Sequence, residues 1–142
     1  MKVIKGYHCA FQTHYHLVFP VKYRKALLCK EVEEELKQIV KGIGERYEIE
    51  FESIGCDNNH IHVLCSFHQK YSIGEVVRKF KSITARELFK KFPNLKKDLW
   101  GGEFWSDGYY AATVGERGNW AIVERYVKAQ GHTLQDAQLR LF

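Results

Sequence analysis

The chain has 142 residues, of which 45% are hydrophobic and 14% aromatic, so it is long and apolar enough to form a core unaided. Its four cysteines include no C-x-x-C pair, and no apolar segment reaches about 18 residues, which disfavours a zinc knuckle and a membrane span. We therefore expect one domain over residues 1–142, located in the cytoplasm and with no membrane partner. The net charge of +5 favours a polyanionic partner, although solubility alone also accounts for it.

Alternation of residue type predicts the strands. Residues 9–19, CAFQTHYHLVF, alternate strictly and predict one strand. Residues 47–68 alternate on both sides of the polar sequence CDNN, and they predict an antiparallel hairpin that turns there. Residues 103–115, EFWSDGYYAATVG, form a further β-rich aromatic segment.

Helical spacing of apolar residues predicts three helices. The first covers residues 30–46 and has four glutamates near its start, where the helix dipole favours anions. The second covers residues 73–91 and ends before Pro93, and the third lies between Asn119 and Gly131. The order β-α-β-β-α-β-α predicts an α+β fold, a ferredoxin-like or RRM-like antiparallel sheet (βαββαβ) with an additional C-terminal helix.

Two histidine pairs occupy the central strands of this expected sheet. His60 and His62 lie opposite the apolar face of their strand, and His14 and His16 do the same on the first strand. The two strands are neighbours in this topology, and the helices that follow them cover the other face. Both pairs are therefore predicted to share the face that remains open to the third helix.

The third helix carries a phenol and a carboxamide at helical spacing. Tyr126 and Gln130 are four residues apart and so lie on the same helix face. If that face covers the histidines, two imidazole nitrogens and one amide oxygen can hold a divalent cation beside the phenol. The residues alone leave open which histidine pair takes part, and whether either pair is more than ordinary strand histidines.

Five segments together resemble a known family, the HUH-type single-tyrosine transposases of small bacterial and archaeal insertion sequences. They are YHLVFPVKYR (15–24), DNNHIHVL (57–64), FKSITARELFKKFP (80–93), FWSDGYYAATVG (104–115) and RYVKAQ (125–130), and they span nearly the whole chain. The resemblance implies cleavage and rejoining of single-stranded DNA at the ends of an insertion sequence through a 5′-phosphotyrosine intermediate. It also implies single-stranded DNA with subterminal hairpins as partner and an active homodimer, in which the tyrosine helix of one subunit can complete the site of the other.

The resemblance also implies roles for individual residues. Tyr126 would be the nucleophile, and His60, His62 and Gln130 would be the ligands of Mg²⁺ or Mn²⁺. Family members often have an acid directly before the motif, whereas Asn59 stands there in this chain. Asp57 is the nearest acid, and it remains a candidate for the metal or for a position behind the ligands. His16 is a candidate for the same supporting position.

Further residues are expected to contact DNA or to move with it. Basic and hydroxyl side chains recur every four residues on the second helix: Arg78, Ser82, Arg86 and Lys90. Lys22 and Arg24 follow the first strand, and both sets would contact phosphates. A solvated helix face is the alternative. Gly115 and Gly118 precede the third helix and are expected to form a hinge that lets it carry attached DNA, with a plain loop as the alternative.

Two other functions fit the same residues. A rolling-circle-type nicking nuclease uses the same kind of site, but such enzymes are usually larger. A domesticated, non-catalytic module of the same fold would only bind nucleic-acid hairpins. Such a module would have no need for Tyr126 and Gln130 in register with a histidine pair.

Overall fold

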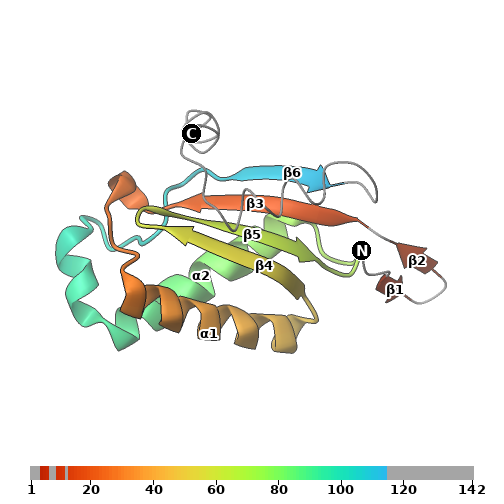
Figure 1. Cartoon of the computed structure of the whole chain (residues 1–142), viewed down its shortest axis with the longest axis horizontal. Coiled ribbons are helices and arrows are strands. Elements are labelled where there is room, and N and C mark those ends of the chain that lie inside the picture. The colour runs from red at the N-terminus through yellow and green to blue at the C-terminus, as the bar shows by residue number, and fades with distance from the viewer. Residues whose placement is uncertain (1–3, 7–8, 12, 115–142) are drawn as a thin grey trace.

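The structure is a computed structural model that describes residues 4–6, 9–11 and 13–114. In chain order its elements are β1 (Ile4–Gly6), β2 (Cys9–Phe11), β3 (His14–Pro20), the 3-10 helix η1 (Lys22–Arg24), α1 (Lys30–Tyr47), β4 (Glu50–Asp57), β5 (His60–Ser66), α2 (Ile73–Lys91), the 3-10 helix η2 (Pro93–Asp98) and β6 (Tyr110–Val114). Figure 1 shows the main sheet as one layer, with α1 and α2 packed side by side against one of its faces.

The main sheet has four antiparallel strands in the order β4-β5-β3-β6. This order confirms the predicted α+β class and places β3 and β5, the two histidine strands, at the centre. Elements β3, α1, β4, β5, α2 and β6 follow the predicted βαββαβ order. The predicted additional C-terminal helix lies outside the described residues.

The core lies between the sheet and the two helices. Leu17 and Phe19 of β3 and Ile61 of β5 are at most 1% exposed, and they belong to one buried cluster with apolar side chains of both helices. The Phe19 ring stacks on Phe80 of α2 at a centroid distance of 4.5 Å. Side-chain alternation on the strands therefore directs every second residue into this core and the residues between them to the opposite face.

Both described α-helices follow their sequence signals. The predicted bounds of α2 are confirmed. At its start the Ser72 hydroxyl accepts the Glu75 backbone N–H at 3.1 Å, and the Glu75 carboxylate accepts the Ser72 backbone N–H at 2.9 Å. α1 begins at Lys30 as predicted and extends one residue further, to Tyr47. No helix of the described part of the chain is long and apolar enough to span a bilayer.

The prediction of one strand over residues 9–19 was wrong. β2 ends at Phe11 and pairs with β1 in a separate two-stranded sheet, whereas β3 begins at His14 and belongs to the main sheet. Alternation indicates extended backbone but carries no information about the strand with which it pairs. One alternating run therefore serves two sheets.

The hairpin turn is also shorter than predicted. β4 continues through Cys56 and Asp57, which pair with Ile61 and His60, so only Asn58 and Asn59 form the turn. The polar residue Asp57 suggested a loop, yet its backbone still pairs in the ladder. Its carboxylate accepts the Asn58 N–H at 2.8 Å, a local bond that stabilises the start of the turn.

Two glycines of α1 provide a matched test of how closely this helix packs against the chain that follows it. A Cβ at Gly44 would lie 2.8 Å from the carbonyl oxygen of Ile49, whereas a Cβ at Gly42 would meet nothing within 4 Å. We expect Gly44→Ala to lower the free energy of unfolding by about 1–3 kcal/mol. Gly42→Ala should raise it by roughly 0.5–1 kcal/mol, as expected for an open helix position. Urea unfolding of both variants measures these changes, and equal stability of the two would contradict the packing described.

Candidate functional site

Both histidine pairs share the face of the sheet that lies opposite α1 and α2. His62 of β5 pairs with Val18 of β3, and His60 pairs with Pro20, so the even-numbered residues of both strands point the same way. His14, His16, His60 and His62 are all at most 4% exposed. The parity prediction is therefore confirmed, and four imidazoles lie buried on one sheet face.

His16 and His62 form the closest contact between the two pairs. Nε2 of His16 lies 3.1 Å from Nδ1 of His62, and the rings stack at a centroid distance of 5.3 Å. Burial lowers the pKa of His16 to about 4. Burial, with smaller contributions from His60 and His16, lowers the pKa of His62 to about 3. Both rings are consequently neutral at pH 7 and retain a nitrogen lone pair.

His60 is oriented by the residue before it. Nδ1 of His60 lies 2.6 Å from Oδ1 of Asn59, and an amide oxygen only accepts, so the His60 Nδ1–H donates. The lone pair of the neutral ring then resides on Nε2. In the sequence Asn59 was no more than a departure from the family pattern, whereas the structure gives it a definite role. A carboxamide adjacent to H-x-H is the only sequence signal that pointed to it.

The geometry of His60 and His62 suits one shared metal ion. Their ring centroids are 4.9 Å apart, with the planes 69° apart. A metal–nitrogen bond of about 2.1 Å, added to the ring radius, lets one ion contact rings whose centroids are within roughly 6.5 Å. Nε2 of His62 is buried and has no hydrogen-bond partner among the described residues. The described residues contain no group of three His, Cys, Asp or Glu placed to hold a metal.

Of the other residues considered for the site, the structure describes His14, His16 and Asp57. His16 contacts His62 directly, but Nδ1 of His14 lies 2.9 Å from Oε1 of Glu52, away from the pair. Asp57 lies opposite His60 in the ladder, and its carboxylate is bonded to the turn backbone. Tyr126, Gln130, Gly115 and Gly118 lie outside the described residues.

A lysine of α2 that the sequence did not single out fixes the loop before β6. Nζ of Lys81 donates to the backbone carbonyls of Ser106, Asp107 and Gly108 at 2.8, 3.1 and 3.2 Å. Burial lowers the pKa of this ammonium, and the three carbonyls replace the lost water. The loop leads into Tyr110, whose ring meets that of His16 edge-on at 5.7 Å. Lys81 therefore supports one wall of the histidine cluster.

The predicted phosphate-contacting residues of α2 form an exposed row, which we call the α2 basic row: Arg78, Ser82, Arg86 and Lys90. Hollows flank this row on two sides, one toward the end of α1 and one toward residues 102–107. Lys22 differs, because its ammonium pairs with Glu103 at 3.1 Å and Asp107 at 3.5 Å. Arg24 is exposed.

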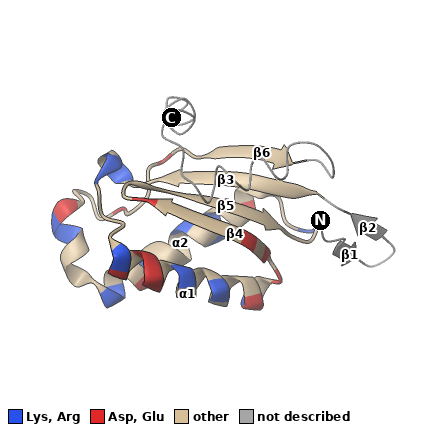
Figure 2. Cartoon of the chain, viewed as in Figure 1, with Lys and Arg blue, Asp and Glu red and all other residues tan. Residues whose placement is uncertain are grey.

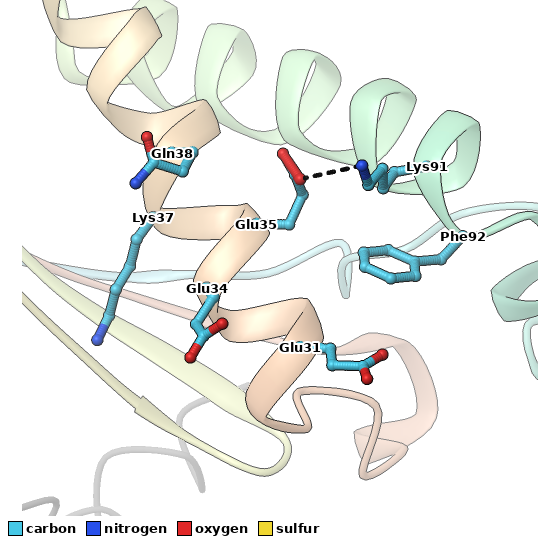
Figure 3. Close-up of a pocket in the computed structure, with 7 residues that line it drawn as sticks. All are labelled: Glu31, Glu34, Glu35, Lys37, Gln38, Lys91 and Phe92. Carbon is cyan, nitrogen blue, oxygen red and sulfur yellow. Dashed lines mark ion pairs between the residues drawn. The ribbon is translucent and has the colours of Figure 1, made fainter.

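Charge is distributed unevenly over the molecule. Strands β3, β5 and β6 contain no Lys, Arg, Asp or Glu, as the tan strands of Figure 2 show. Figure 3 shows a hollow between α1 and the end of α2, lined by Glu31, Glu34, Glu35, Lys37, Gln38, Lys91 and Phe92. Three glutamates and two lysines line it, and Glu35 pairs with Lys91 at 3.9 Å, so the hollow has a small excess of negative charge.

Asn59 provides a direct test of the site's organisation. Asn59→Ala removes the acceptor that holds the His60 ring, so it should weaken Mn²⁺ binding by roughly 10–100-fold. Asn58→Ala, in the same turn and exposed, is the matched control and should bind Mn²⁺ as the native protein does. Isothermal titration with Mn²⁺ measures both affinities. Unchanged affinity in Asn59→Ala would show that the amide does not orient a ligand.

Comparison with known proteins agrees with this architecture along the chain. Residues 9–130 match the family described as transposase IS200 like. The ISDra2 transposase TnpA of Deinococcus radiodurans is 35% identical over 130 residues, which cover 92% of this chain and 91% of that protein. The transposase for insertion sequence element IS200 of Salmonella typhimurium is 30% identical over 123 residues, covering 87% and 80%.

Solved structures show the same fold. A crystal structure of a Deinococcus radiodurans R1 protein assigned as a transposase superimposes with a TM-score of 0.76 at 30% identity, covering 97% of this chain and 98% of that one. A REP-associated tyrosine transposase bound to a REP hairpin superimposes with a TM-score of 0.60 at 9% identity, covering 87% and 70%, a likeness of fold alone. The sequence match, the identity to the curated transposases and the shared sheet together show that the chain belongs to the family of IS200-like transposases.

Proposed function

We propose that the protein cleaves and rejoins single-stranded DNA at the ends of its insertion sequence, with Tyr126 as nucleophile. His60, His62 and Gln130 would hold Mg²⁺ or Mn²⁺ beside it. The observation that carries the proposal is the orientation of the two histidines. Each has its Nδ1 bonded to a neighbour, Asn59 or His16, so Nε2 is the nitrogen that each ring would present to a metal.

Each step of the proposed reaction exchanges one phosphoester for another. The Tyr126 phenol loses its proton and its oxygen bonds to phosphorus, while the bond from phosphorus to the 3′-oxygen breaks and that oxygen leaves as a 3′-hydroxyl. The DNA 5′-phosphate is then esterified to tyrosine. A second 3′-hydroxyl reverses the exchange and frees the phenol. Bond energy is retained throughout, so rejoining requires no nucleotide cofactor.

The neutral imidazoles suit this chemistry. When bound, a divalent cation would polarise the phosphodiester and offset the charge that develops on its oxygens. Because His60 and His62 are neutral ligands, they leave the cation's positive charge undiminished toward phosphate. Burial maintains that neutrality, since it lowers the pKa of His62 far below 7.

The charge distribution supports a path for the DNA. The α2 basic row is exposed and can contact phosphates, whereas the hollow between α1 and α2 has a small excess of negative charge and is a less favourable site for them. A structure of similar fold is a REP-associated tyrosine transposase bound to a REP hairpin, and subterminal hairpins are the proposed partner here. We place the hinge at Gly115 and Gly118, and a homodimer would let the helix of one subunit serve the other.

Formation of a covalent adduct tests the proposed function. The native protein, incubated with Mn²⁺ and single-stranded DNA from the ends of its own element, should form a protein–DNA species that persists on a denaturing gel. Tyr126→Phe should abolish this species, because a phenyl ring has no oxygen to attack. Tyr109→Phe, which changes a 37% exposed tyrosine, is the matched control and should leave it intact.

Two results would contradict the assignment. An adduct of undiminished yield in Tyr126→Phe would place the nucleophile elsewhere. If the native protein binds the hairpin DNA but forms no adduct, it is a non-catalytic hairpin-binding module.

A further inference from the structure

Two residues that are linked by a hydrogen bond, one in η1 and one in the turn after η2, have exposed aromatic side chains. Trp100 is 88% exposed and Tyr23 is 56% exposed, the two highest values among the large hydrophobic residues of the described chain. The Tyr23 phenol donates a hydrogen bond to the Trp100 carbonyl oxygen at 3.1 Å, which joins the two loops. We call this pair the aromatic platform.

A hydrogen-bonded backbone turn holds Trp100 in place. Gly102 N–H bonds to the Leu99 carbonyl at 3.1 Å, and Gly101 has a φ of 90°, so Trp100 occupies a corner of a tight turn. Leu99, directly before it, is 2% exposed and anchors the turn in the core. The exposed Trp100 indole is therefore attached to a turn that the buried Leu99 side chain anchors.

Tyr23 is held in a conformation that its residue type disfavours. Tyr23 has a φ of 58° and Arg24 a φ of 52°, both in the left-handed region. Such strain is concentrated at ligand-binding positions and persists only where surrounding contacts maintain it. Here those contacts are the bond from Tyr23 to Trp100 and the bond from the Lys22 N–H to the Phe104 carbonyl at 2.8 Å.

The platform adjoins the histidine site along the chain. Pro20 pairs with His60, and the Val21 N–H bonds to the Asn59 carbonyl at 2.8 Å. Tyr23 follows three residues after Pro20, so their Cα atoms are at most about 11 Å apart. A DNA strand with one phosphate at the histidines can therefore place a base at the platform only a few nucleotides away.

The charges beside the platform match a nucleic-acid backbone. Residues 22–25, Lys-Tyr-Arg-Lys, carry three positive charges and no negative one. Lys25, and Lys97 of η2, are exposed and form no ion pair with another described residue. Lys22 pairs with Glu103, and its Nζ also lies 5.6 Å from the centroid of the Tyr23 ring. Aromatic faces flanked by cations are the means by which proteins bind unpaired bases.

From these observations we infer that Tyr23 and Trp100 form a stacking site for an unpaired base of the DNA strand at the histidine site. The inference rests on the proposed function and adds a subsite to it. Its occupant is a single-stranded nucleotide, because the bases of a duplex are already stacked on one another. Trp100 is the main stacking surface and Tyr23 is the residue that positions it.

Oligonucleotide binding tests the platform. The probes are a 15-nucleotide oligo-dT and an abasic oligomer with the same number of phosphates, and fluorescence anisotropy measures the affinity of the protein for each. The native protein should prefer oligo-dT by roughly 5- to 100-fold, the range expected when a base stacks on an aromatic ring. Trp100→Ala should remove this preference and leave abasic binding unchanged, and Trp100→Phe should retain part of it.

Arg86→Ala is the matched control on the α2 basic row. We expect its contact with DNA to be to phosphate, so the substitution should change the affinity for the two oligomers equally. A thermal melt identical to that of the native protein establishes that Trp100→Ala is folded, as expected for a side chain that is 88% exposed. An unchanged preference for oligo-dT in Trp100→Ala would overturn the inference. So would loss of self-association with unchanged DNA binding, because the platform would then contact a second copy of the chain.

The same set of proteins separates the platform from the proposed reaction. A native protein that prefers oligo-dT through Trp100 but forms no covalent adduct would support the platform and reject the strand transferase. If the native protein forms the adduct but Trp100→Ala keeps the full preference for oligo-dT, the result would support the transferase and reject the platform.

Discussion

The register between β3 and β5 is the constraint on which the rest of the site depends. Side chains alternate between faces, so a slip of one residue would turn His60 and His62 into the core and expose Ile61. The core prevents this slip, because Leu17, Phe19 and Ile61 pack against the two helices. Packing on one face of the sheet thereby places the imidazoles on the other, and His16 comes within hydrogen-bond distance of His62.

Burial then determines the chemistry of that face. Strands β3, β5 and β6 carry no Lys, Arg, Asp or Glu, whereas β4 brings Glu52 to within 2.9 Å of His14. Desolvation lowers the pKa of His16 and His62. Neutral imidazoles are suitable metal ligands, whereas protonated ones are not. The charges that would contact DNA lie instead on helix surfaces and loops. This separation of neutral site and basic surroundings fits a transposase of this family, which acts on a polyanion.

Local patterns in the sequence predicted most of the architecture but few of the contacts. Apolar spacing predicted the bounds of α2, and alternation placed His60 and His62 on the correct face, because both signals depend on near neighbours in the chain. The division of residues 9–19 between two sheets was missed, since pairing partners are not local. The His16–His62 contact joins residues 46 positions apart, and the exposure of Trp100 depends on a turn and a loop that meet only in the folded chain. Tyr126 and Gln130 remain predictions from the sequence.

The proposed metal site requires that β3 and the hairpin turn orient the Nε2 atoms of His60 and His62 toward one metal ion. Nitrogen NMR of the imidazoles at neutral pH, with and without a diamagnetic divalent cation, tests it most directly. We expect both rings to carry their proton on Nδ1 in the metal-free protein and the cation to shift both Nε2 resonances together. A proton on Nε2 of His62, or a cation that shifts only one of the two rings, would contradict it.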